Sequence, residues 1–117
     1  MLHVDQTPNE PHNKLHSLQG IYYWSETIKD GATTVVIPGS HRKLWHKDNY
    51  QGVGDYSRIG LKSEYLYEPT RLIIPANSLL IFNSKLIHRG VWGPHRMCFM
   101  ISFYKKKERS AAALKKN

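Results

Sequence analysis

The sequence predicts an all-β fold, an antiparallel sandwich or jelly roll, and two observations support this prediction. Short apolar or aromatic runs follow one another closely, and Pro, Gly or Asn residues separate them, as in chains of strands and turns. Before residue 108, no segment carries the 3.6-residue apolar period of an amphipathic helix. Strands this short and this closely spaced favour two packed antiparallel sheets.

The expected elements follow in chain order. The first strand is the aromatic run SLQGIYYW (17–24), and the turn KDG (29–31) leads to a β-branched strand, ATTVVIPG (32–39). Residues 40–65 are polar and contain several glycines, so we expect the longest irregular loop of the chain there. The segment SAAALKK near the C-terminus favours a helix but is too short for one that is stable alone. The other expected strands are 70–75, 77–84, 86–92 and 96–104.

Length, cysteine content and hydropathy limit the class of protein. At 117 residues the chain has room for one domain, which we place at residues 1–104, followed by a basic tail at 105–117. The single cysteine, Cys98, excludes an intrachain disulfide and a thiolate zinc cluster and is typical of a reducing compartment. No apolar run approaches about eighteen residues, and the first residues lack the pattern of a signal peptide. We therefore expect a cytoplasmic protein with no membrane partner.

The formal net charge of +8 suggests an anionic partner, but the charge is unevenly distributed. The tail KKKERSAAALKKN carries six of the seventeen Lys and Arg residues against one acidic residue. Without the tail, the chain contains eleven basic and eight acidic residues, which is an ordinary balance for a protein surface. A nucleic-acid partner is therefore less favoured, since no aromatic stacking motif accompanies the charge.

His3 and Asp5, in MLHVDQTP, are the first candidates for chemistry. Residues i and i+2 of a strand point to the same face, so this H-x-D would present an imidazole and a carboxylate side by side. In a chain of this composition, H-x-D arises by chance in about one case in four. The pair therefore predicts a metal site only together with a third ligand.

His88 is the best candidate for that third ligand. It lies in KLIHRG, an apolar strand pattern that follows SLLIFN. Two histidines and one carboxylate form the facial triad of non-haem Fe(II) oxygenases, which leaves positions open for a bidentate cosubstrate and O2. The alternative is a core histidine that bonds a backbone carbonyl.

Arg96 is the candidate for cosubstrate binding. It lies eight residues after His88, across an expected GVWGPH hairpin, and opens the last expected strand. A guanidinium binds a carboxylate through two parallel hydrogen bonds, as the distal end of a keto-diacid requires. The alternative is a surface arginine beside a turn.

Four stretches of the chain occur in an order that is typical of one enzyme family. They are HVDQTP, GATTVVIPGSHRKLW, PANSLLIFNSKLIHRG and HRMCFMISFY, and together they span about residues 2–104. In this order the chain resembles the phytanoyl-CoA dioxygenase family of Fe(II)/2-oxoglutarate-dependent oxygenases. The resemblance implies a double-stranded β-helix, which is a cupin-like jelly roll.

The resemblance also implies an activity and a role for each candidate residue. His3, Asp5 and His88 would bind Fe(II), and Arg96 would pair with the C5 carboxylate of 2-oxoglutarate. The reaction would release succinate and CO2 and use O2 to hydroxylate a small organic substrate.

The chain departs from the family before the H-x-D motif. The family's domain has a strand, and often helices, at this point, whereas only Met1 and Leu2 precede His3 here. We therefore expect the C-terminal portion of the family domain, with a further N-terminal segment or a second chain completing the barrel. Two other functions stay open: a jelly roll that binds a metal or ligand without turnover, and a basic β-protein that binds nucleic acid.

Overall fold

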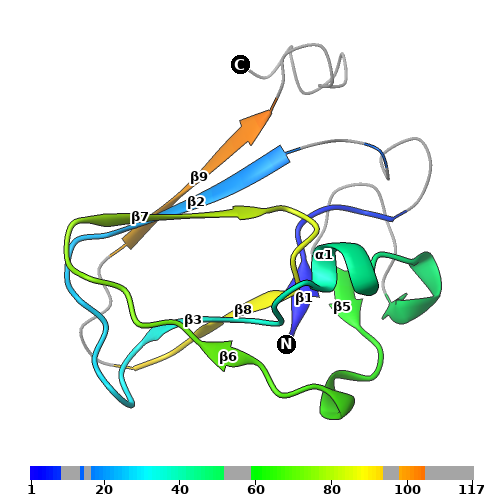
Figure 1. Cartoon of the computed structure of the whole chain (residues 1–117), viewed down its shortest axis with the longest axis horizontal. Coiled ribbons are helices and arrows are strands. Elements are labelled where there is room, and N and C mark those ends of the chain that lie inside the picture. Colours follow the sequence, from blue (N-terminus) through cyan, green and yellow to red (C-terminus); the bar gives the residue numbers. More distant parts are fainter. Residues whose placement is uncertain (9–13, 15–16, 52–58, 94–97, 105–117) are drawn as a thin grey trace.

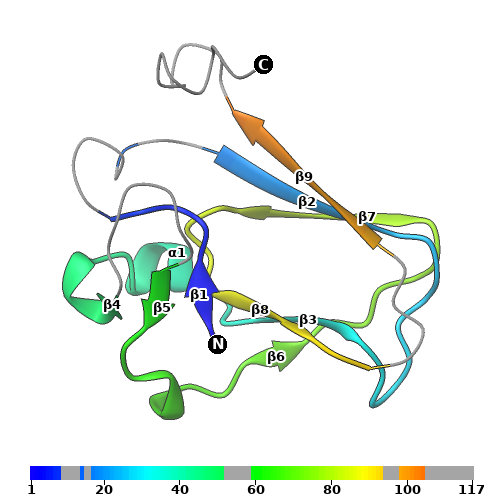
Figure 2. The same ribbon diagram turned by 180° about the vertical axis from the view of Figure 1, so that it is seen from behind.

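The structure is a computed structural model that describes residues 1–8, 14, 17–51, 59–93 and 98–104. These residues are mostly β and form two antiparallel sheets (Figure 1). The two sheets lie one above the other in this view and in the view from behind (Figure 2). The all-β antiparallel class that the sequence predicts is therefore confirmed.

The larger sheet has six strands, and the smaller sheet has three. The spatial order of the larger sheet is β4 (Tyr50–Gln51), β5 (Ile59–Leu61), β1 (His3–Val4), β8 (His88–Val91), β3 (Thr33–Val36) and β6 (Thr70–Arg71). The smaller sheet has the order β7 (Ser78–Asn83), β2 (Ser17–Tyr23) and β9 (Cys98–Tyr104). All pairs between these strands are antiparallel.

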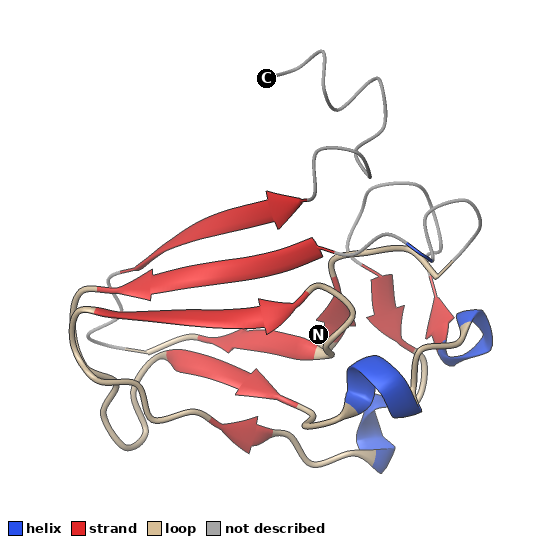
Figure 3. Ribbon diagram, turned by 45° about the horizontal axis from the view of Figure 1, so that its top comes forward, coloured by secondary structure: helices blue, strands red, loops and turns tan. Residues whose placement is uncertain are grey.

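The stretch 40–65 is more regular than its polar composition suggests, so the prediction of one long irregular loop is wrong for its described residues. It contains helix α1 (Ser40–Lys43), the 3₁₀ helices η2 (Lys47–Asn49) and η3 (Glu64–Leu66), and the strands β4 and β5. The strands form because β5 extends the larger sheet beyond β1, with Gly60 opposite His3. The helices lie at one end of the sheets (Figure 3).

The strand expected at 70–75 is also shorter in the structure, where β6 contains only Thr70 and Arg71. Leu72 continues the pairing by donating its amide to the carbonyl of Thr34. The amide of Ile74 instead donates to the Thr27 hydroxyl at 2.8 Å, outside the strand ladder. This side-chain bond ends the strand, because an amide bonded to a side chain no longer pairs with a neighbouring strand.

Two apolar clusters lie on opposite faces of the larger sheet. Side chains alternate between the faces of a strand, so Ile87 and Val35 point away from the face that carries His88. The cluster on that outer face consists of Leu2, Val4, Val35, Tyr50, Leu61 and Ile87. The cluster on the inner side, where the smaller sheet packs, consists of Ile21, Tyr23, Ile74 and Phe82.

The turn Pro38-Gly39-Ser40 connects β3 to α1 and contacts Ile87, the residue before β8. Gly39 has φ 78°, a left-handed conformation that glycine adopts without steric cost. Ser40 follows it and is almost fully buried. Its hydroxyl accepts a hydrogen bond of 2.8 Å from the amide of Ile87. The turn therefore holds the residue that immediately precedes His88.

None of the helices in the described part of the chain is both long enough and apolar enough to cross a bilayer.

Candidate metal centre

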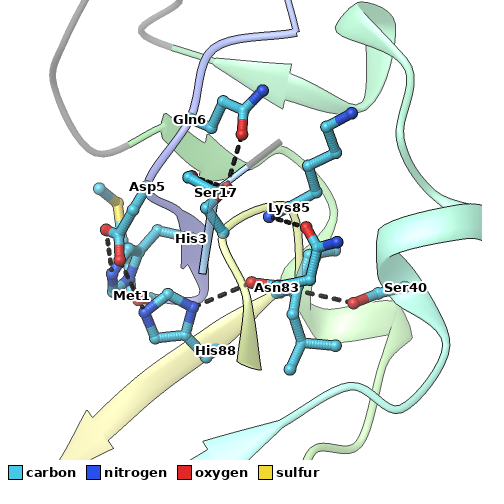
Figure 4. Close-up of polar contacts among 12 residues, drawn as sticks. Met1, His3, Asp5, Gln6, Ser17, Ser40, Asn83, Lys85 and His88 are labelled. Atoms are coloured by element: carbon cyan, nitrogen blue, oxygen red, sulfur yellow. Dashed lines mark hydrogen bonds and ion pairs between the residues drawn. The ribbon is translucent and has the colours of Figure 1, made fainter. Parts of the chain in front are cut away.

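Three of the four candidate site residues come together between the sheets. His3 lies on β1 and is paired with His88 of the neighbouring strand β8. Asp5 follows β1 directly, and its carboxylate lies beside both imidazoles (Figure 4). One potential ligand atom from each of the three residues lies within 4.8 Å of the other two. The group is therefore close enough to hold a metal ion. Arg96 lies outside the described residues.

Both histidines direct the same ring nitrogen at the Asp5 carboxylate. Nε2 of His3 lies 3.4 Å from Oδ1, and Nε2 of His88 lies 3.2 Å from Oδ2. The two rings are tilted by 53° with centroids 4.5 Å apart, so they converge without stacking. The i, i+2 spacing that the sequence offers for His3 and Asp5 thus places the two side chains side by side.

Backbone carbonyls fix the other nitrogen of each ring. Nδ1 of His3 lies 2.9 Å from the carbonyl oxygen of Met1, and Nδ1 of His88 lies 2.9 Å from that of Leu86. A carbonyl oxygen only accepts, so each Nδ1 carries a hydrogen, and in the neutral ring Nε2 presents a lone pair. Two lone pairs facing a carboxylate repel it unless a cation lies between them, either a metal ion or a proton on each ring.

The carbonyl bond of His88 is the feature expected of an ordinary core histidine, and it is present. It involves Nδ1 alone and leaves Nε2 directed at Asp5. A carbonyl bond of this kind is also the usual support of a metal-binding histidine, because it sets the tautomer and the ring orientation. The two interpretations of His88 therefore do not exclude one another.

The centre is shielded from solvent. His3 and His88 are 6% and 3% exposed. Burial raises the pKa of the Asp5 carboxyl, but the contacts with His3 and His88 outweigh burial and hold this pKa well below its ordinary range. Oδ2 of Asp5 is buried, and no residue described in the structure forms an aligned hydrogen bond with it. Its 3.2 Å approach to Nε2 of His88 is therefore a close contact without an aligned hydrogen bond.

Residues from two other segments, Ser17 and Ser84, hold the chain around Asp5 in place. The amide of Asp5 donates to the carbonyl of Ser84 at 3.3 Å. The hydroxyl of Ser84 donates to Oε1 of Gln6 and accepts from the hydroxyl of Ser17, each at 2.5 Å. All three of these polar side chains are buried. No local pattern in the sequence indicates these contacts, because Ser17 and Ser84 lie 67 positions apart in the chain.

Phe82 forms an apolar wall beside the centre. Its ring centroid lies 4.6 Å from that of His88, with the planes tilted by 57°. Phe82 is a core residue of β7 by the alternation of that strand, and only the packing of the two sheets places it at the site. Farther along the same interior, the hydroxyls of Tyr23 and Thr34 bond each other at 2.5 Å. The space between the sheets is thus mixed in polarity, as a ligand-binding interior commonly is.

No protein-family model, curated protein or solved structure matches this chain. The resemblance to the phytanoyl-CoA dioxygenase family therefore stays a prediction.

Proposed function

We propose that the chain is an Fe(II)- and 2-oxoglutarate-dependent oxygenase that hydroxylates a small organic substrate, with His3, Asp5 and His88 as the iron ligands. The observation that carries this proposal is the convergence of two imidazole Nε2 atoms on one partly buried carboxylate. Two histidines and one carboxylate are the donor set of the non-haem Fe(II) oxygenases.

The proposal includes a double-stranded β-helix, and the strand order supports it. Strands β1, β3, β6 and β8 belong to the larger sheet, and β2, β7 and β9 belong to the smaller one. The chain therefore changes sheet between β1 and β2, between β2 and β3, and at each step from β6 to β9. Such winding between two facing antiparallel sheets is the pattern of a jelly roll. In this interpretation β4 and β5 are an addition beside β1.

The spacing of the ligand atoms fits a transition-metal ion. An ion that binds neighbouring ligands at about 2.1 Å holds those ligand atoms about 3 Å apart. The two nitrogen–oxygen distances in the centre are 3.4 Å and 3.2 Å, so small side-chain movements suffice to bring the ligands to an ion. The buried Oδ2 of Asp5, which has no aligned hydrogen bond within the described part of the chain, supplies the negative charge that such an ion requires.

Each residue of the centre has a defined task in this proposal. Bound Fe(II) supplies, with 2-oxoglutarate and O2, the oxidative decarboxylation to succinate and CO2 and the transfer of one oxygen atom to a C–H bond. His3 and His88 donate from Nδ1 to backbone carbonyls and so keep Nε2 directed at the ion. Asp5 stays ionised because its pKa is low. Arg96, two residues before β9 in the sequence, would bind the C5 carboxylate of 2-oxoglutarate.

Anaerobic addition of Fe(II) and 2-oxoglutarate to the purified protein tests the proposal. We expect a weak visible charge-transfer band, and succinate after O2 is admitted, with a metabolite panel identifying the substrate that accelerates its release. His88→Ala is expected to abolish both signals. His46→Ala is the matched control, because His46 pairs with Asp48 at 3.4 Å on the surface, with 64% of its side chain exposed.

The outcomes separate the candidate functions. The proposal is contradicted if no band forms and His88→Ala leaves the iron affinity unchanged. A band without succinate indicates a jelly roll that binds metal without turnover. Oligonucleotide binding that falls steeply with salt and disappears on deletion of 105–117 would instead indicate a nucleic-acid-binding protein.

A further inference from the structure

Glu64, in the 3₁₀ helix η3, contacts the residue before β1 and a residue of β8, the two strands that carry the candidate histidine ligands. Its Oε2 accepts a hydrogen bond of 3.0 Å from the amide of Leu2. Its Oε1 lies 3.8 Å from Nη1 of Arg89. Leu2 immediately precedes His3, and Arg89 immediately follows His88. One carboxylate therefore reaches a direct chain neighbour of each histidine.

These contacts lie on the side of the sheet opposite to the candidate metal centre. Side chains alternate along a strand, so Arg89 points to the face that His88 does not occupy. Leu2 belongs to the apolar cluster on that outer face. Glu64 thus cannot be a ligand itself, and any influence on the centre passes through the backbone of β1 and β8.

The strand that Glu64 contacts has few other attachments. Strand β1 contains two residues, and it pairs with β8 at one position, His3 opposite His88. On its other side, β1 pairs with β5 at His3 and Val4. Leu2 adds one further ladder bond, because its carbonyl accepts from the amide of Leu61. An additional hydrogen bond at Leu2 therefore further restricts the position of this short strand, which carries His3 and leads to Asp5.

The two contacts of Glu64 differ in strength. Both partners of the Glu64–Arg89 ion pair have 39% exposed side chains, and exposed ion pairs contribute little. The bond to the Leu2 amide joins a charged acceptor to the backbone of an almost fully buried residue, which is the stronger arrangement. The backbone bond is therefore the contact expected to matter.

We propose that Glu64 is a positioning residue for the metal centre, which holds β1 against β8 and so fixes the distance between His3 and His88. This inference rests on the proposed function, since it assumes that the centre binds a metal ion. Removing a group that orients a metal ligand commonly lowers the metal affinity by about 10–100-fold. Because Glu64 acts indirectly, we expect the lower end of this range.

Titration with Co(II), followed by its visible absorption, tests the inference in the full chain. Glu64→Ala is expected to weaken Co(II) binding about tenfold and to change the absorption spectrum, because the ligands are less well oriented. Glu64→Gln is expected to restore the wild-type spectrum and most of the wild-type affinity, since the amide oxygen still accepts from Leu2, although without the negative charge. Glu68→Ala is the matched control, because it removes an exposed carboxylate four residues later.

Folding of each variant is checked by circular dichroism before titration. If Glu64→Ala does not fold, Glu64→Asp replaces it: the shorter side chain keeps the charge but moves the carboxylate away from the Leu2 amide, so weaker Co(II) binding is again expected. Unchanged affinity and an unchanged spectrum in the tested variant overturn the inference. Equal weakening by Glu64→Gln and Glu64→Ala overturns it as well, because the charge rather than the backbone bond would then be responsible.

The proposed function fails separately from this inference. Wild-type protein that binds Co(II) but releases no succinate with Fe(II) and 2-oxoglutarate contradicts the oxygenase activity and leaves the role of Glu64 to be decided by the titration. Wild-type protein that binds no Co(II) contradicts both.

Discussion

His88 reaches Asp5 with one ring nitrogen and the backbone with the other. Nε2 lies 3.2 Å from Oδ2 of Asp5, and Nδ1 lies 2.9 Å from the carbonyl oxygen of Leu86. Rotation of the ring would break the backbone bond, so this orientation is fixed before any ligand arrives. Preorganisation of this kind reduces the cost of binding, because the side chain loses little further freedom.

Divalent metal is expected to stabilise the folded protein. An ion that binds only the folded state at about 100 times its dissociation constant raises the free energy of unfolding by about 2.7 kcal/mol. Asp5→Asn should remove most of this increase, and EDTA should reverse it in the wild type. Asp48→Asn is the control, because Asp48 forms an exposed pair with His46. Urea unfolding with and without Co(II) measures the effect, and equal stabilisation of both variants would exclude the Asp5 centre.

The stability of the metal-free protein is expected to decrease in acid through Asp5. The folded protein holds the pKa of Asp5 well below the ordinary value of 3.8, so the unfolded chain binds the proton more readily. Asp5 therefore contributes stability above about pH 4, and this contribution is lost as pH falls toward the folded pKa. Urea unfolding between about pH 2 and pH 6 should give a shallower pH dependence for Asp5→Asn than for the wild type. Asp30→Asn, at an exposed turn residue, should retain the wild-type slope.

Tyr23→Phe is expected to destabilise the contact between the two sheets. The hydroxyls of Tyr23 and Thr34 bond each other at 2.5 Å, and both residues are almost fully buried. Removing the Tyr23 hydroxyl leaves the buried Thr34 hydroxyl without this partner, which lowers the free energy of unfolding by about 1–2 kcal/mol. Tyr22→Phe is the matched control, because the Tyr22 hydroxyl donates to Asn77 on the surface and should cost less than about 0.5 kcal/mol. Equal losses of unfolding free energy in the two variants, measured with urea, would contradict a stabilising role of the buried hydrogen bond between Tyr23 and Thr34.

Ser84→Ala is expected to lower stability by about 1–3 kcal/mol. The Ser84 hydroxyl bonds both Ser17 and Gln6 in a buried chain, so its removal deprives two polar groups of a partner. Ser78→Ala serves as the comparison, because its hydroxyl forms one long, exposed bond to the carbonyl of Ala76. A loss of the same size in both variants, measured by urea unfolding, would show that the buried chain contributes nothing particular.

Ile87→Ala is expected to cost about 2–5 kcal/mol, because it leaves a cavity in the outer apolar cluster. Ile87 is fully buried there, next to His88 in the chain. Ile73→Ala is the control, since Ile73 is 90% exposed and its truncation should change stability by less than about 0.5 kcal/mol. Thermal or urea unfolding of the two variants gives the comparison, and similar values would contradict the core placement of Ile87.

Much of the strand layout follows from local sequence signals. The expected strands 17–24, 32–39, 77–84, 86–92 and 96–104 correspond to β2, β3, β7, β8 and β9, although most are shorter at their ends. Their apolar and β-branched residues lie between turn formers, so residues close in sequence suffice to indicate them. Local signals do not indicate β4 and β5, because these strands are two and three residues long and depend on pairing with each other and with β1.

The candidate centre could be predicted in part for the same reason. The spacing of His3 and Asp5 indicates a shared face, and the apolar strand around His88 indicates a buried imidazole. The sequence contains no signal that the Asp5 amide bonds the Ser84 carbonyl, or that Glu64 bonds the Leu2 amide. Both contacts join segments that are far apart in the chain, and only the packing of the sheets brings them together.

The pairing of His3 with His88 makes the centre a property of strand register as well as of residue identity. A shift of β8 by one position would turn Arg89 or Ile87 inward and His88 outward, because successive side chains face opposite sides of a sheet. A one-residue insertion in the turn between Asn83 and Leu86 would therefore remove the centre while every ligand remained in the sequence. Relatives of this chain are best compared by the length of that turn as well as by their histidines.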